Sequence, residues 1–244
     1  MISRNYQIGG KISAVNSIYY QVHDYCTGYE SDEVPDFTVE IQQEDIDSER
    51  EKSIREDIAE ERHIRSFPDP YHEELADYRK ISEKMPVYDT ILFHGSAVSI
   101  DGKGFLFTAK SGTGKSTHTA LWREVFGDKA VMINDDKPLI RITEQEVTVF
   151  GTPYNGSHRI GNNISVPLKG LCILERSSRN SICKITKKQA YPMLIQQTYR
   201  PDNLQMLRKT LTLIDRMAEK VSLYRLECNM NQEAAIIAYQ EMKG

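Results

Sequence analysis

The sequence predicts an α/β fold in which a mixed, largely antiparallel sheet surrounds a glycine-rich turn. Three observations lead to this prediction. Short apolar runs of the strand type alternate with longer segments of helical periodicity. One apolar run, residues 105–109, leads through a glycine-bearing turn into an amphipathic segment that begins near Lys115. A tight turn at residues 101–104 joins this run to the strand before it, so these two strands should pair antiparallel.

The chain has 244 residues, which is enough for one domain or for one domain with a small addition. We expect a small N-terminal β lobe with a charged helical connector over residues 1–85, and a larger α/β domain over residues 86–244. In the lobe, the pair Gly9-Gly10 separates two weakly alternating stretches, which predicts a hairpin. Residues 18–25 fit either a short helix or a third strand, and residues 37–41 alternate as a strand.

The connector, residues 42–65, is dense in charges of both signs and has only a thin apolar stripe. This pattern favours a solvated helix or a mobile connector over a segment that binds a partner. Prolines follow it, and helical periodicity then covers residues 72–85. We expect His63 and His72 to be surface side chains, not ligands.

In the larger domain, apolar runs predict strands and helical periodicity predicts helices. The expected strands are residues 90–94, 97–100, 105–109, 131–134, 138–142, 147–151, 166–174 and 222–228. The expected helices begin near Lys115 and cover residues 187–197, 203–221 and 231–242.

The turn at residues 110–114 and the helix after it have the residue types of a phosphate-binding loop. Gly112 and Gly114 let the backbone turn tightly, so that N–H groups can point into one concavity. The helix N-terminus favours an anion there, Lys115 can reach the outer phosphates, and Ser116 offers a hydroxyl to Mg²⁺. The strict pattern has a glycine where this chain has an alanine before the turn. The predicted nucleotide site comprises Ser111, Gly112, Thr113, Gly114, Lys115, Ser116 and Thr117.

Two adjacent carboxylates, Asp135 and Asp136, follow an apolar strand-like run that begins at Val131. One helix and a return of the chain separate them from the glycine turn. Chemistry on Mg²⁺·ATP needs such groups close to the phosphates, because one carboxylate can hold the metal while the other accepts a proton.

These features together resemble a known enzyme core. SGTGKST, the aspartate pair and the His-Gly of LFHGSAV are similar to the catalytic core of HPr kinase/phosphorylase, which ATP-dependent phosphoenolpyruvate carboxykinase shares. The matched region is roughly residues 90–176. The resemblance implies that Asp135 is the general base, that Asp136 and Ser116 bind Mg²⁺, and that His94 lies at the active site.

A wider set of segments resembles small HPr-kinase-like proteins of bacteria, whose substrates are mostly unassigned: YRKI, LFHGSAV, SGTGKSTHTALW, NDDKP, GTPYNGSHR and VPLKGLCIL. This resemblance implies an HPr kinase/phosphoenolpyruvate carboxykinase-like core. Residues 86–244 would then be a P-loop kinase-like catalytic domain with C-terminal helices.

The segment of residues 151–163 is rich in glycine and asparagine and carries His158 and Arg159. It could close over a phosphate, and Arg159 could then offer a bidentate guanidinium to the transferred group. The alternative is an ordinary surface loop. Arg200, just before a proline, is a weaker candidate for the same site.

Composition excludes several classes of protein. With 31 basic and 35 acidic residues the net charge is −4, which suggests no nucleic-acid partner. We find no apolar run long enough to cross a membrane and no secretory segment after Met1. The four cysteines are scattered without a C-x-x-C pair, which argues against a disulfide framework or a zinc site. We therefore expect a cytoplasmic protein.

We predict a kinase that uses ATP and Mg²⁺ to phosphorylate a hydroxyl of a peptide, a protein or a small metabolite. Two alternatives remain open: a sensor or interaction module that binds ATP without turnover, and a carboxykinase-type enzyme. The sequence names neither the acceptor nor the oligomeric state, so a homo-oligomer stays open.

Overall fold

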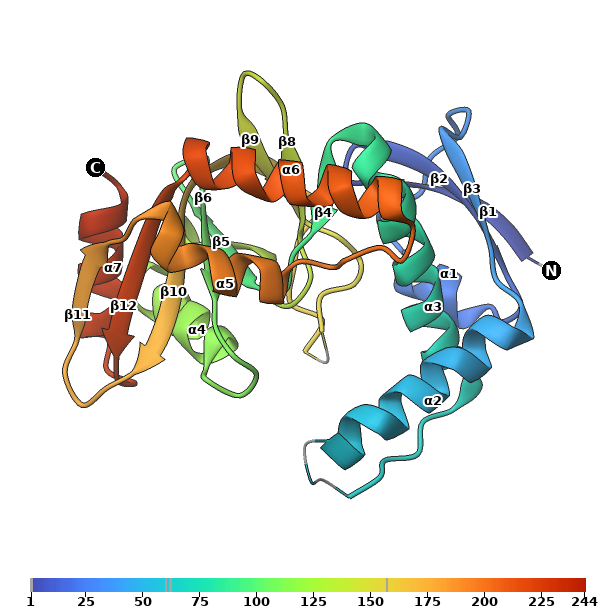
Figure 1. The fold of residues 1–244 in the computed structure, drawn as a ribbon, viewed down its shortest axis with the longest axis horizontal. Helices are drawn as coiled ribbons and strands as arrows, with labels where there is room; N and C mark the ends of the chain where they lie inside the picture. Colours follow the sequence, from blue (N-terminus) through green and yellow to red (C-terminus); the bar gives the residue numbers. More distant parts are fainter. Residues whose placement is uncertain (1, 60, 62, 157) are drawn as a thin grey trace. The chain divides into compact units, whose positions relative to one another are not determined.

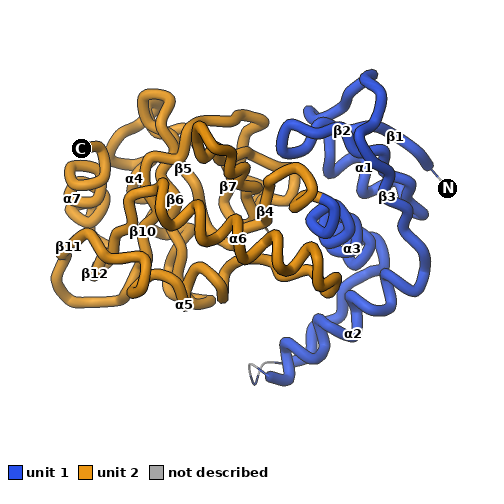
Figure 2. Tube along the Cα trace, turned by 45° about the horizontal axis from the view of Figure 1, so that its top comes forward, with its two compact units in different colours: residues 1–84 blue, residues 85–244 orange. Residues whose placement is uncertain are grey.

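The structure is a computed structural model that describes residues 2–59, 61, 63–156 and 158–244. The expectations for the connector and for the 151–163 segment include residues 60, 62 and 157, which lie outside the described residues. The chain divides into two compact units, unit 1 with residues 1–84 and unit 2 with residues 85–244 (Figure 2). Each unit is described below by itself.

Unit 1 begins with the predicted hairpin, formed by β1 (Ile2–Ile8) and β2 (Lys11–Ser17). Gly9 and Gly10 form its two-residue turn with φ values of 60° and 68°. Positive φ at both central residues is the geometry whose twist matches the two flanking strands, which explains the two glycines. β3 (Phe37–Glu40) adds to β2 in parallel.

The segment after the hairpin contains α1 (Gln21–Tyr25), so the helix alternative of the prediction is correct. Two longer helices complete unit 1: α2 (Gln43–Ala59) and α3 (Asp69–Lys84). α3 begins three residues earlier than expected. Pro70 lies in its first turn, where a missing N–H has no helical partner to lose.

The expectation that His72 is a surface side chain is wrong. His72 is only 1% exposed, while His63 is exposed as predicted. Because α3 already begins at Asp69, His72 lies one helical turn before the fully buried Ala76 and shares its face. The rings of Phe67 and Tyr71 lie against it, and burial lowers the pKa of its imidazole.

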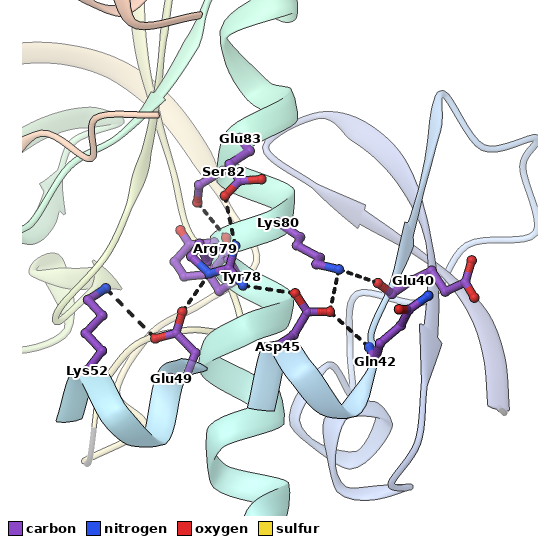
Figure 3. A network of polar contacts seen from close by, with 10 residues as sticks. All are labelled: Glu40, Gln42, Asp45, Glu49, Lys52, Tyr78, Arg79, Lys80, Ser82 and Glu83. Atoms are coloured by element: carbon purple, nitrogen blue, oxygen red, sulfur yellow. Dashed lines mark hydrogen bonds and ion pairs between the residues drawn. The ribbon is translucent and has the colours of Figure 1, made fainter. Parts of the chain in front are cut away.

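The charged connector helix α2 is held by a network of ion pairs to α3 (Figure 3). Arg79 on α3 donates to Glu49 at 2.6 Å and to Asp45 at 3.2 Å, both on α2, and to Glu83 of its own helix at 2.9 Å. Lys80 pairs with the same Asp45. The side chain of Glu49 is only 6% exposed. α2 is therefore not simply solvated, because its ion pairs supply the attachment that its thin apolar stripe lacks.

Unit 2 is built on a sheet of nine strands, and the predicted mixed α/β class is correct for it. The strand order is β4-β8-β9-β10-β6-β5-β7, and β12 pairs with both β10 and β11. Only β10–β6 and β10–β12 are parallel among the pairs described, so the sheet is largely antiparallel. The strands are β4 (Thr90–Leu92), β5 (Ser96–Ile100), β6 (Lys103–Thr108), β7 (Val131–Asn134), β8 (Leu139–Ile142), β9 (Val147–Phe150), β10 (Ser165–Arg176), β11 (Ser181–Lys184) and β12 (Ser222–Cys228).

The antiparallel pairing predicted across the 101–104 turn is confirmed by β5 and β6. β11 was not predicted, because its four residues carry no apolar alternation. In the described part of unit 2, four helices and two short 3₁₀ helices accompany the strands: α4 (Lys115–Phe126), α5 (Lys187–Gln197), α6 (Leu204–Lys220), α7 (Glu233–Met242), η1 (Met85–Tyr88) and η2 (Gly127–Lys129).

The strands bury alternate residues in two separate apolar cores, one on each face of the sheet. Leu106 of β6 packs into a core with residues of α5 and α6. Its neighbours Phe105 and Phe107 pack into a second core with residues of α4 and α7. This period of two, with helices over both faces, gives unit 2 three layers (Figure 1). Among the described residues, no helix is long and apolar enough to cross a membrane, and none of the four cysteines forms a disulfide.

Candidate functional site

The topology brings three strand ends together at one edge of the unit 2 sheet. β5 lies between β6 and β7 and runs antiparallel to both. The start of β5 therefore meets the ends of its two neighbours, as the register shows: Ser96 lies opposite Phe107, and Ala97 lies opposite Asn134. His94 comes just before β5, the glycine turn follows β6, and the aspartate pair follows β7 directly. All three predicted features therefore lie at this edge of the sheet.

The backbone around His94 is fixed by neighbours that are distant in sequence. The N–H of His94 donates to the carbonyl of Gln197 at 2.7 Å, and the N–H of Gly95 donates to the carbonyl of Asp136 at 2.9 Å. A Cβ atom on Gly95 would lie 2.9 Å from both Leu106 Cδ1 and the carbonyl oxygen of Phe107. Glycine at position 95 thus allows the chain to pass close to β6.

The glycine turn leads directly into α4. Gly112 has a φ of 71° and Gly114 a φ of 117°, values that side chains with a Cβ rarely adopt. The N-cap of α4 is Gly114, which supplies no side-chain hydrogen bond. The N–H of His118 makes the first bond to the carbonyl of Gly114, at 2.9 Å. Ser116 and Thr117 are exposed in this first helical turn.

Lys115 is half-buried at the start of α4 and interacts with both aspartates. Burial lowers the pKa of its ammonium group, and the negative charges of Asp136 and Asp135 oppose that effect. The structure therefore places the lysine after the turn and the two carboxylates within electrostatic reach of one another.

Asp135 is nearly buried, with 7% of its surface exposed. Ser96 of β5 donates its hydroxyl to Asp135 Oδ1 at 2.6 Å, and Thr119 of α4 donates to the same oxygen at 3.4 Å. The two hydroxyl oxygens also lie 2.8 Å apart. Thr119 in turn lies 3.2 Å from the carbonyl oxygen of Ser116. Asp135 is thus held against the first turns of α4.

Asp136 faces a different environment. Its Oδ1 lies 3.2 Å from His94 Nε2, and the side chains of these two residues are 29% and 37% exposed. Burial disfavours the charged carboxylate, but the His94 hydrogen bond and the charges of Lys137 and Lys115 outweigh it and lower the pKa of Asp136. The carboxylate therefore stays ionised beside a histidine.

The fully buried side chain of Asn134 orients the aspartate pair. Its Oδ1 accepts from the N–H groups of Asp136 at 2.9 Å and Lys137 at 2.7 Å. Its Nδ2 donates to the hydroxyl of Thr152 at 2.9 Å and lies 3.4 Å from the carbonyl oxygen of Tyr154. One amide thus joins the acid-bearing segment to the start of the 151–163 segment.

The 151–163 segment is packed against the site along its first half. Residues 151–155 are buried, so this half is not the ordinary surface loop of the alternative. A Cβ on Gly156 would lie 3.0 Å from the Cβ of Asp136. Arg159 follows with a φ of 50°, and its N–H donates to the carbonyl of Gly156 at 3.2 Å. The side chains of His158 and Arg159 are exposed.

The structure thus brings together His94, Lys115, Asp135 and Asp136. Ser111 and Gly112 are exposed on the turn, and Thr113 is half-buried there. Sequence reasoning missed three residues that position this group: Ser96, Thr119 and Asn134. Ser96 and Asn134 lie next to motif residues that were recognised. Thr119 lies one turn after Ser116 on α4, a spacing that indicates a shared helix face.

His118 is a buried titratable group directly behind the glycine turn. It is 3% exposed and accepts a hydrogen bond from Trp122 Nε1 at 3.1 Å, and its ring centroid lies 4.6 Å from that of Phe107. Burial lowers its pKa to about 4. The folded protein therefore keeps this imidazole neutral at pH values at which the unfolded chain protonates it.

We expect this difference to appear as acid sensitivity of unit 2. Between pH 6.5 and about 4 the unfolded chain binds the proton at His118 and the folded chain does not. The free energy of unfolding therefore decreases as the pH is lowered through this range, by about 3 kcal/mol at most. In His118→Gln this part of the pH dependence should disappear, while the exposed His158→Gln serves as control. Urea unfolding, followed by fluorescence of the single tryptophan, measures it. Equal acid slopes in His118→Gln and the wild type would contradict the assignment.

Asn134→Ala should destabilise unit 2 and release the start of the 151–163 segment, because two partly buried N–H groups and the buried Thr152 hydroxyl lose their partner. We expect a loss of at least about 2 kcal/mol in unfolding free energy. The same tryptophan fluorescence measures this loss, and proteolysis should cut faster within residues 151–163. The exposed Asn231→Ala should change stability by less than about 0.5 kcal/mol. Unchanged proteolysis in Asn134→Ala would show that the amide does not anchor the segment.

The chain is similar to known proteins both in sequence and in structure. No curated protein matches the chain. A solved structure described as the HPr(Ser) kinase/phosphatase from Coxiella burnetii is similar over 63% of this chain and 99% of that chain, with a TM-score of 0.34 and 9% identity. The sequence model of a family described as SynChlorMet cassette protein ScmC matches residues 76–234, which is more than half of the chain. The chain therefore belongs to the family of the SynChlorMet cassette protein ScmC.

Proposed function

We propose that the protein is a kinase that uses ATP and Mg²⁺ to phosphorylate a hydroxyl of a peptide, a protein or a small metabolite. One observation supports this most strongly: a glycine turn with its lysine and two carboxylates in different environments meet at one edge of one sheet. Phosphoryl transfer depends mainly on positioning and on neutralising charge, and this group of residues can do both.

The turn and the start of α4 would hold the phosphates. The first N–H groups of a helix have no intrahelical partners, and the helix dipole favours negative charge there. The N–H groups near Gly114 and the ammonium group of Lys115 therefore form a site for a polyphosphate. The lowered pKa of Lys115 reflects a buried charge that a bound phosphate would compensate.

ATP would supply the phosphoryl group, and Mg²⁺ would neutralise charge on the phosphate oxygens. The hydroxyl of Ser116 and one carboxylate are the groups of this chain that fit such an ion, because Mg²⁺ prefers oxygen ligands and commonly takes only one or two from the protein. The second carboxylate would accept the proton of the acceptor hydroxyl as its oxygen bonds to phosphorus. Exposed Arg159 would hold the transferred group.

The two carboxylates allow two assignments. The resemblance to HPr kinase assigns the base to Asp135 and the metal to Asp136. The contacts favour the reverse. Asp135 is nearly buried and is tied through Thr119 to the helix that carries Ser116, which suits a metal ligand. Asp136 is more exposed and pairs with His94, which suits a base that must reach an acceptor.

Replacing Lys115 by Met should weaken binding of Mg²⁺·ATP at least about 10-fold, because a charge-assisted contact is lost. Folding should be retained. The exposed Lys103→Met, at the opposite end of β6 from the turn, is the matched control and should bind like the wild type. Isothermal titration calorimetry and the gain in melting temperature with nucleotide measure the effect. If Lys115→Met keeps full affinity, the turn is not the phosphate site.

The aspartate pair tests the mechanism itself. Under the favoured assignment, Asp136→Asn should keep Mg²⁺·ATP affinity and slow single-turnover transfer by about 10²-fold or more. Asp135→Asn should instead raise the Mg²⁺ concentration needed for nucleotide binding. The opposite pattern would restore the assignment that the resemblance implies. Transfer of labelled phosphate to peptide and metabolite panels comes first: tight binding without any product would make the chain an ATP sensor.

A further inference from the structure

Arg176, the last residue of β10, reaches the glycine turn from a distant part of the sequence. β10 lies parallel to β6, and its Ile173 is paired with Thr108 at the end of β6. β10 then continues for three residues to Arg176, alongside the point where the chain leaves β6 for the turn. Its guanidinium donates from Nη2 to the carbonyl of Gly112 and from Nε to the carbonyl of Thr113, at 3.3 Å.

These two bonds fix the direction of backbone N–H groups. A trans peptide is planar, so its carbonyl and its N–H point in opposite directions. When Arg176 holds the carbonyl of Thr113, the N–H of Gly114 points away from the guanidinium. The carbonyl of Gly112 fixes the N–H of Thr113 in the same way, and that N–H already closes the turn onto the carbonyl of Lys110 at 3.2 Å.

The turn needs such an external constraint. Gly112 and Gly114 both have positive φ, and glycine populates other backbone regions about as readily. A Cβ on Gly112 would meet no atom within 4 Å, so packing does not hold this residue in place. An arginine is suited to the task, because its planar fork can donate to two carbonyls that are one residue apart.

We propose that Arg176 is a positioning residue for phosphate binding: it holds the carbonyls of Gly112 and Thr113 so that the N–H of Gly114 is oriented toward the anion before the anion binds. This inference rests on the proposed function of the turn as a nucleotide site. Arg176 acts through the backbone, since its guanidinium is engaged with the two carbonyls. The chemical class of ligand is a nucleoside polyphosphate, for which we use Mg²⁺·ATP.

The test compares Arg176→Gln and Arg176→Lys with the wild type in the full chain. Both variants should bind Mg²⁺·ATP about 10-fold more weakly by calorimetry, because a lysine keeps the charge but cannot span two carbonyls. If transfer is measurable, KM for ATP should rise while kcat changes little. Without nucleotide, hydrogen exchange of the amides of residues 112–116 should be faster in both variants.

Arg179→Gln, an exposed arginine three residues further on, is the matched control and should resemble the wild type. Full affinity in Arg176→Lys would show that only the charge matters and would overturn the positioning role. Wild-type affinity in Arg176→Gln, with a wild type that binds, would overturn this inference and leave the proposed function standing. A wild type that binds no Mg²⁺·ATP would refute both.

Discussion

The candidate site depends on one buried amide, the side chain of Asn134. Its oxygen accepts the two N–H groups that follow Asp135, and its NH₂ group donates to the segment that begins at Gly151. A buried amide must satisfy both its donors and its acceptor, and here Asp136, Lys137 and Thr152 supply the partners. The amide of Asn134 therefore links the conformation of the aspartate pair and of the turn after β7 to that of the packed half of the 151–163 segment.

Two adjacent carboxylates would repel each other if they shared one environment. The fold separates them, since neighbouring residues at a strand end point in different directions. Asp135 enters a site of two hydroxyls between β5 and α4, while Asp136 faces a histidine and two lysines. The two aspartates are adjacent in sequence, and their chemical difference comes from the side chains of the neighbouring elements that each one contacts.

Much of the local structure was predictable, because strand, turn and helix signals lie within a few residues of one another. The run from β6 through the glycine turn into α4 and the antiparallel turn before it are examples. Contacts between distant segments were not. His72 is buried because α3 begins earlier than its apolar pattern indicates, and α2 is attached through Arg79 by charge, which a hydrophobic pattern cannot reveal. Ser96 and Arg176 acquire their roles only from the pairing of β5 and β10 with β6.

The position of β5 in the sheet also determines the width of the site. Because β5 separates β6 from β7, the strand that carries the glycine turn and the strand that carries the acids lie two strand spacings apart, or about 10 Å. The backbone hydrogen bonds of β5 with β6 and β7 set this span. Substitutions in the surrounding loops can therefore change the rim of the candidate site without changing the separation between its glycine turn and its carboxylates.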